Sequence, residues 1–79
     1  MDIDNLVVMA NRIGAFFAAM PDREAALAGI AEHLRKFWEP RMRRQFLAAF
    51  DAGELGALSD IVREAVRIHH ASLEPAQAA

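Results

Sequence analysis

The chain has 79 residues, of which 54% are hydrophobic, and its formal net charge is −2. This length allows one domain at most, and such a hydrophobic content favours a packed core over disorder. The charge balance of nine basic and eleven acidic side chains does not favour nucleic-acid binding, and the absence of cysteine excludes disulfides and thiolate metal sites.

A core this small contributes only about 3–5 kcal/mol, so small folds usually need further stabilisation. With disulfides excluded, an oligomer or a larger partner is the remaining common remedy. No stretch approaches the roughly 20 apolar residues of a membrane span. The acidic start, Met1-Asp2-Ile3-Asp4, lacks the basic region of a signal peptide. We therefore expect a soluble cytoplasmic protein that does not act alone and does not associate with membranes.

The first predicted helix begins at Asp4 or Asn5, since either side chain can accept hydrogen bonds from the first turn. Its apolar residues recur every three or four positions and therefore share one stripe, which comprises Leu6, Met9, Ile13, Phe16, Phe17 and Met20. Pro21 and Asp22 end this helix and start the next one.

The second predicted helix repeats the apolar stripe with Leu27, Ile30, Ala31, Leu34, Phe37 and Trp38. We expect the two helices to pack as a hairpin. Gly14 and Gly29 each cost about 1 kcal/mol of helix stability relative to alanine. Either these glycines allow close helix approach or they are merely tolerated.

A third helix is predicted from Pro40, which suits a first helical position, to Gly53, which accepts the left-handed conformation that ends helices. Its apolar face comprises Met42, Phe46, Leu47 and Phe50. Ser59 or Asp60 caps a fourth helix, lined by Leu58, Ile61, Val62, Ala65 and Val66. No alternating β pattern occurs. The predicted fold is all-α, a small four-helix bundle or a pair of helical hairpins, with one domain at residues 1–73 and a frayed tail at residues 74–79.

The segment at residues 33–44 distinguishes this chain from a generic helical domain. It contains five of the nine basic side chains and one acid, whereas the rest of the chain has four basic and ten acidic side chains. The five are Arg35, Lys36, Arg41, Arg43 and Arg44. Trp38, the only tryptophan, lies among them, and tryptophan and arginine are enriched in binding hot spots. This polarity indicates a protein-binding corner on an acidic body.

A purely structural interpretation exists for each of these residues. Phe37 and Trp38 lie on the apolar stripe, so at least one is expected in the core. The arginines could form a solvated face near a helix end. We favour the core for the aromatic side chains and an interface for the basic ones.

Catalytic and metal-binding motifs are not apparent. The three histidines, His33, His69 and His70, are few and scattered. His69 and His70 point about 100° apart on a helix, so both cannot easily face one ion. No glycine-rich phosphate loop, HExxH motif or Ser-His-Asp order is present. Glu32 and Glu64 are most simply exposed helix acids. We therefore predict no catalytic, metal-binding or cofactor-binding residue in this chain.

Two stretches together resemble a known family. LVVMANRIGAFF at residues 6–17 and HLRKFWEPRMR at residues 33–43 are similar to the delta subunit of NAD-dependent, molybdenum-containing formate dehydrogenases. The resemblance extends from about Asn5 to about His70. It implies a bacterial complex that oxidises formate and reduces NAD, in which the alpha subunit holds a molybdenum bis-pterin guanine dinucleotide centre and iron–sulfur clusters. The beta and gamma subunits carry FMN and further clusters.

The resemblance implies a non-catalytic accessory subunit that binds the large alpha subunit and supports complex stability or cofactor maturation. On this reading Trp38, Arg41 and Arg43 contact the large subunit. Further partner-binding candidates are Arg35, Lys36, Arg44, His33 and Asn11. Asn11 is also expected to hydrogen-bond at the helix hairpin.

Three alternatives remain open from the sequence. The chain could be a free maturation chaperone for the molybdenum subunit, or a stand-alone homodimer. It could also be a small helix-turn-helix DNA-binding protein that uses Arg41, Arg43 and Arg44, although the acidic net charge speaks against this.

Overall fold

The computed structural model describes residues 2–76, and within them all regular structure is helical. The helices are α1 (Ile3–Phe17), α2 (Arg23–Phe37), α3 (Pro40–Asp51), α4 (Asp60–Ile68) and α5 (His70–Leu73). This architecture confirms the all-α prediction and its four main helices. The one-turn helix α5 was not expected from the sequence, and it arises because the chain bends at His69.

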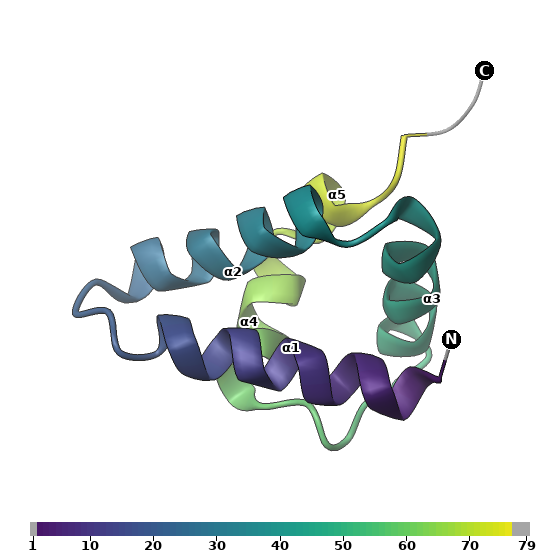
Figure 1. Ribbon diagram of the computed structural model, residues 1–79, viewed down its shortest axis with the longest axis horizontal. Coiled ribbons are helices and arrows are strands. Elements are labelled where there is room, and N and C mark those ends of the chain that lie inside the picture. Colours follow the sequence, from purple (N-terminus) through teal and green to yellow (C-terminus); the bar gives the residue numbers. More distant parts are fainter. Residues whose placement is uncertain (1, 77–79) are drawn as a thin grey trace.

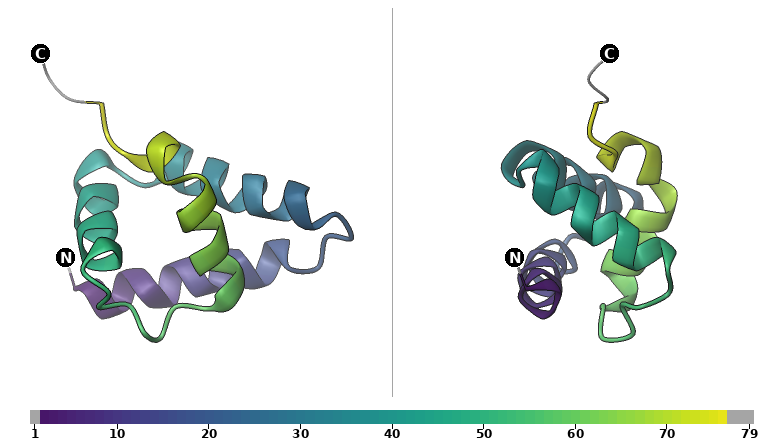
Figure 2. Two further views of the ribbon diagram at one scale, coloured as in Figure 1. Left: turned by 180° about the vertical axis from the view of Figure 1, so that it is seen from behind. Right: turned by 90° about the vertical axis from the view of Figure 1, so that its right-hand side faces the viewer.

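The helices α1 and α2 form an antiparallel hairpin, as predicted, and the other helices pack around it (Figure 1). Helix α4 packs against both arms of the hairpin, whereas α3 packs against α1 and α5 packs against α2. The view from behind shows α4 lying across the hairpin, with α3 at the open end of the hairpin (Figure 2). The result is an irregular helical cluster, because the short helices cross the long ones instead of running parallel to them.

Local capping explains most of the helix boundaries. Asp2 caps α1 by accepting a hydrogen bond from the backbone N–H of Asp4 at 3.0 Å, so the helix begins earlier than the predicted Asp4 or Asn5. Asp22 caps α2 in the same way, as predicted. Pro40 occupies the first position of α3, and Gly53 adopts a positive φ of 74° just after that helix.

The core is formed by apolar side chains from all five helices and from the loop between α3 and α4. Its largest fully buried members are Phe46, Leu6, Ile30, Leu34, Leu73, Val62 and Val66. The stripe predicted for the fourth helix is buried as expected, from Leu58 to Val66. The stripe predicted for the first helix is wrong at its end, because Phe16 and Met20 are exposed.

Both helical glycines lie at close contacts, which supports the close-approach interpretation. A Cβ atom on Gly14 would lie 2.4 Å from Cγ2 of Val62, so α1 and α4 meet at this glycine. A Cβ atom on Gly29 would lie 2.5 Å from Cε1 of Phe17. The glycines therefore give α4 and the Phe17 ring the space that they occupy.

Of the tail predicted at residues 74–79, residues 77–79 lie outside the described part of the chain. Within the described part, Glu74 contacts the ring of His70.

Candidate partner-binding surface

The basic side chains at residues 33–44 lie mostly on the surface. Arg35, Lys36, Arg41 and Arg44 are exposed. Lys36 forms an ion pair with Glu32 one turn earlier in α2, with 3.1 Å between Nζ and Oε1. These four residues are therefore accessible to a partner, and their contact with one stays a prediction.

Trp38 is the main correction to the predicted site. Its side chain is only 5% exposed and packs edge-to-face on Phe46, with 5.3 Å between the ring centroids. It follows α2 directly, where the backbone turns extended and directs the indole into the space between α2, α3 and α5. The indole is thus a core residue, as the structural interpretation expected, and does not present a free face to a partner.

Arg43 and Asn11 also have internal roles. Arg43 donates from Nη1 to the backbone oxygen of Leu73 at 3.2 Å, which links α3 to α5. Asn11 donates to the backbone oxygen of Ala57 at 3.0 Å and accepts from the backbone N–H of Ser59 at 2.8 Å. Asn11 therefore holds the loop before α4, and the expected hydrogen bond at the α1–α2 hairpin is wrong.

A row of aromatic rings lies on the surface where α1 and α2 meet. The row comprises Phe16, Phe17, His33 and Phe37, and is called the aromatic row below. The centroid of the Phe17 ring lies 5.2 Å from that of Phe16 and 6.4 Å from that of His33, which in turn lies 4.8 Å from that of Phe37. Phe16 is 75% exposed and Phe37 is 69% exposed. Two helices thus present contiguous unburied aromatic surface.

Two shallow hollows flank the aromatic row, and each is lined by one basic side chain. One has a volume of about 320 Å³ and is lined by Arg12, Ile13, Phe16, Phe17 and His33. The other has a volume of about 210 Å³ and is lined by Phe17, Gly29, Glu32, His33, Lys36 and Phe37. Phe17 and His33 line both hollows. The row is therefore a ridge between two depressions and not a flat patch.

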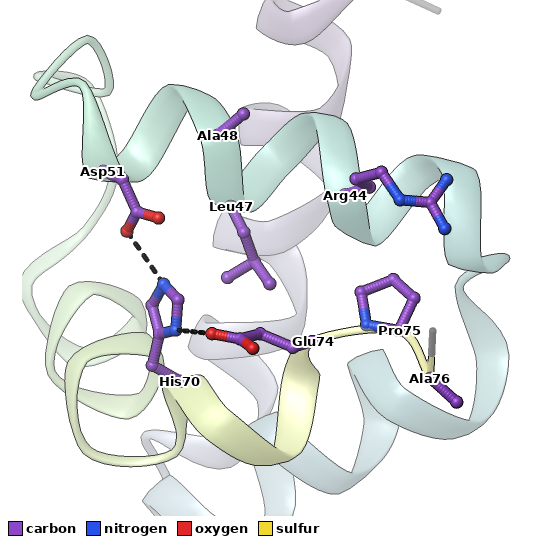
Figure 3. Close-up of a pocket in the computed structure, with 8 residues that line it drawn as sticks. All are labelled: Arg44, Leu47, Ala48, Asp51, His70, Glu74, Pro75 and Ala76. Atoms are coloured by element: carbon purple, nitrogen blue, oxygen red, sulfur yellow. Dashed lines mark hydrogen bonds and ion pairs between the residues drawn. The ribbon is translucent and has the colours of Figure 1, made fainter. Parts of the chain in front are cut away.

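A larger hollow of about 400 Å³ lies on another part of the surface, between α3 and the end of the described chain (Figure 3). His70 lies between two carboxylates there: its Nε2 is 2.8 Å from Oδ1 of Asp51, and its Nδ1 is 3.1 Å from Oε1 of Glu74. A neutral imidazole donates through one nitrogen only, so both contacts are hydrogen bonds only when the ring is protonated. The cluster fastens α5 to α3.

The arrangement of the histidines does not form a metal site. Across residues 2–76, no group of three or more His, Asp or Glu side chains is placed to hold an ion. His33 contacts aromatic rings, and His70 contacts the two carboxylates.

None of the helices within residues 2–76 has the length and apolar character that a membrane span requires.

Four residues of this surface were not predicted from the sequence: Phe16, Phe17, Phe37 and Arg12. A usable signal was present, because neighbouring residues on a helix point about 100° apart. Two adjacent aromatic residues therefore cannot both face a narrow core stripe. In the pair Phe16-Phe17 the second ring is the more buried one, and in the pair Phe37-Trp38 the second ring is again buried.

With this geometry established, comparison with known proteins identifies the family. A family model described as "NADH-dependant formate dehydrogenase delta subunit FdsD" matches residues 5–66. The chain belongs to this delta-subunit family. No curated protein and no solved structure matches the chain.

The delta-subunit match covers most of α1, all of α2 and α3, and most of α4, including every member of the aromatic row. It confirms the resemblance found in the sequence. Membership associates the chain with a formate dehydrogenase complex, in which a delta subunit is one component among several. Contacts with the other components would be made by the exposed surfaces of the molecule.

Proposed function

We propose that the chain is a non-catalytic accessory subunit that binds the large molybdenum-containing subunit of an NAD-dependent formate dehydrogenase. In this role it supports the stability of the complex or the maturation of its molybdenum cofactor. The observation that carries the proposal is the exposed aromatic row in a chain of the delta-subunit family. Aromatic side chains left in water on a small domain are typical of a surface that is buried in an assembly.

The chemistry of the chain fits an accessory role. Iron–sulfur clusters are held by cysteine thiolates, and the chain contains no cysteine. We assign the molybdenum bis-pterin guanine dinucleotide, the iron–sulfur clusters and the FMN of the complex to its alpha, beta and gamma subunits. The small size of the core also suits a subunit that gains stability by binding, because binding to the folded state raises apparent stability.

Deletion of the gene tests this function directly. The remaining complex is purified, and its molybdenum content and formate-dependent NAD reduction are measured and compared with those of the complete enzyme. We expect loss of assembled complex, loss of molybdenum, or both. Unchanged yield, molybdenum content and turnover would contradict the proposal.

A tagged copy of the chain separates a permanent subunit from a transient maturation chaperone. A permanent subunit is recovered with the active enzyme at a fixed ratio, whereas a chaperone is recovered only with the large subunit before its molybdenum is inserted. Recovery of no molybdenum subunit at either stage would exclude both forms of the proposal.

A further inference from the structure

We propose that the aromatic row is the surface through which the chain binds its partner subunit, and that the partner offers an apolar depression edged by carboxylates. This inference rests on the proposed function, which supplies the partner, and adds where it binds and by what chemistry. It moves the centre of the interface away from Trp38, whose indole is buried.

Contiguity distinguishes the row from the other exposed apolar side chains. Val8, Met20 and Ile68 are 46%, 40% and 50% exposed, but none of them contacts the connected rings of the row through a ring of its own. Single exposed apolar residues are normal on protein surfaces and need no partner. The row instead joins Phe16 and Phe37 into one ridge through ring contacts at Phe17 and His33. Such a ridge fits an apolar depression.

The row is held in place before any partner binds. The Phe17 ring lies directly against Gly29, where any larger residue would displace it. Phe17 and His33 are half-buried, and each contacts one of the two exposed rings. Rings that are already ordered lose little conformational entropy on binding, which favours affinity.

Charge indicates what surrounds the depression on the partner. The side chain of Arg12 lines one hollow of the row and has no ion-pair or hydrogen-bond partner among residues 2–76. Lys36 lines the other hollow and is paired with Glu32, which lines the same hollow. This border has a net positive charge, so carboxylates on the partner would complement it.

The same charges disfavour a second copy of this chain as the occupant. In a two-fold symmetric dimer built on the row, each row would meet the other, and the two Arg12 side chains would approach the same interface. Among residues 2–76, Glu32 is the only acidic residue that lines either hollow, and Lys36 already pairs with it. A different polypeptide with acidic side chains is therefore the better fit.

The test compares matched variants of the full-length chain for binding to the large subunit, purified without this chain. The row variant carries Phe16→Ser and Phe37→Ser. The control variant carries Val8→Ser and Ile68→Ser, which also remove two exposed apolar side chains. We expect the row variant to bind about 100-fold more weakly or worse, and the control to bind within about threefold of the natural chain. Both should keep the helical circular dichroism spectrum, and the single Phe16→Ser variant provides a milder form of the same test.

Two charge-reversal variants test whether the positive border of the row contributes to binding. Arg12→Glu should weaken binding about tenfold and reduce its dependence on salt, whereas Arg67→Glu, the same change on α4, should do neither. Equal effects of the two charge reversals would contradict the proposal that carboxylates edge the depression on the partner.

The outcomes separate this inference from the function on which it rests. If the natural chain binds the large subunit and the row and control variants bind equally well, the surface is wrong and the proposed function stands. If the natural chain does not bind at all, the proposed function itself fails. If the isolated natural chain sediments as a dimer and the row variant as a monomer, the row binds a second copy and the inference is overturned.

Discussion

The side-chain amide of Asn11 joins α1 to the start of α4 by accepting a hydrogen bond from the backbone N–H of Ser59 at 2.8 Å. Its Nδ2 group donates to the backbone oxygen of Ala57 in the same loop. One side chain thus satisfies two backbone groups about 46–48 residues away in the sequence. This contact fixes the path of a loop that has no regular structure of its own.

Asn11→Ala should destabilise the chain by about 1–3 kcal/mol, because the substitution leaves two backbone groups of the loop without their partner. The free energy of unfolding from urea titration measures the loss. The neighbouring exposed residue provides the control, since Arg12→Ala should change stability by no more than about 0.5 kcal/mol. Equal effects at the two positions would show that the loop does not depend on the Asn11 amide.

Gly14→Ala should be destabilising although alanine favours helices by about 1 kcal/mol. The new Cβ would lie 2.4 Å from Cγ2 of Val62, a branched side chain with little rotamer freedom. Overpacking of this kind costs about 1–3 kcal/mol, which outweighs the gain in propensity. Thermal unfolding measures the net change.

Val62→Ala offers a way to check the cause. It removes the atom against which the new Cβ would clash, so Gly14→Ala should be less harmful in the Val62→Ala background than in the natural chain. Strictly additive effects in this double-mutant cycle would rule out the proposed contact between α1 and α4.

Trp38→Ala should destabilise the chain strongly and Phe37→Ala hardly at all, although the residues are adjacent. Loss of the buried indole should cost about 3–5 kcal/mol, which is comparable to the whole stability of so small a core. The isolated Trp38→Ala chain should therefore be largely unfolded by circular dichroism. Phe37→Ala removes an exposed ring and should leave the unfolding midpoint nearly unchanged. A stable Trp38→Ala chain would show that the indole is not part of the core.

His70→Ala should loosen α5 without unfolding the rest of the molecule. The ring contacts Asp51 on α3 and Glu74 beyond α5, and exposed ion pairs of this kind contribute about 0–1 kcal/mol. Amide hydrogen exchange should therefore increase at residues 70–73 and stay unchanged in α2. His69→Ala is the control, because that side chain has no ion pair among residues 2–76. Faster exchange throughout the chain would indicate a global role for His70.

The sequence predicted the helices well because local chemistry sets where helices begin and end. Asp22, Pro40 and Gly53 mark boundaries through their own hydrogen-bonding capacity or backbone geometry. The exception at Asp2 also follows from local chemistry, since an earlier aspartate offered an equally good cap. Helix α5 was missed because its break at His69 has no glycine or proline signal.

The candidate site was predicted less well, because exposure is decided by neighbours that are remote in the sequence. Apolar periodicity put both Phe37 and Trp38 on one stripe, yet only the packing of α3 and α5 decided which ring is covered. In the same way, the inward direction of Arg43 depends on a carbonyl group 30 residues later. The basic character of residues 33–44 was readable, but its relation to the aromatic row was not.

By itself, then, the sequence determined an all-α chain, most of its helix ends, the family and a polarised surface charge. These properties depend on residue identity and on short spacings along the chain. Only the tertiary structure decided that Trp38 is buried and that Phe16 and Phe37 form one exposed ridge through Phe17 and His33. The reason is physical: a side chain is buried by whatever packs against it, and here the decisive contacts join helices that are distant in sequence.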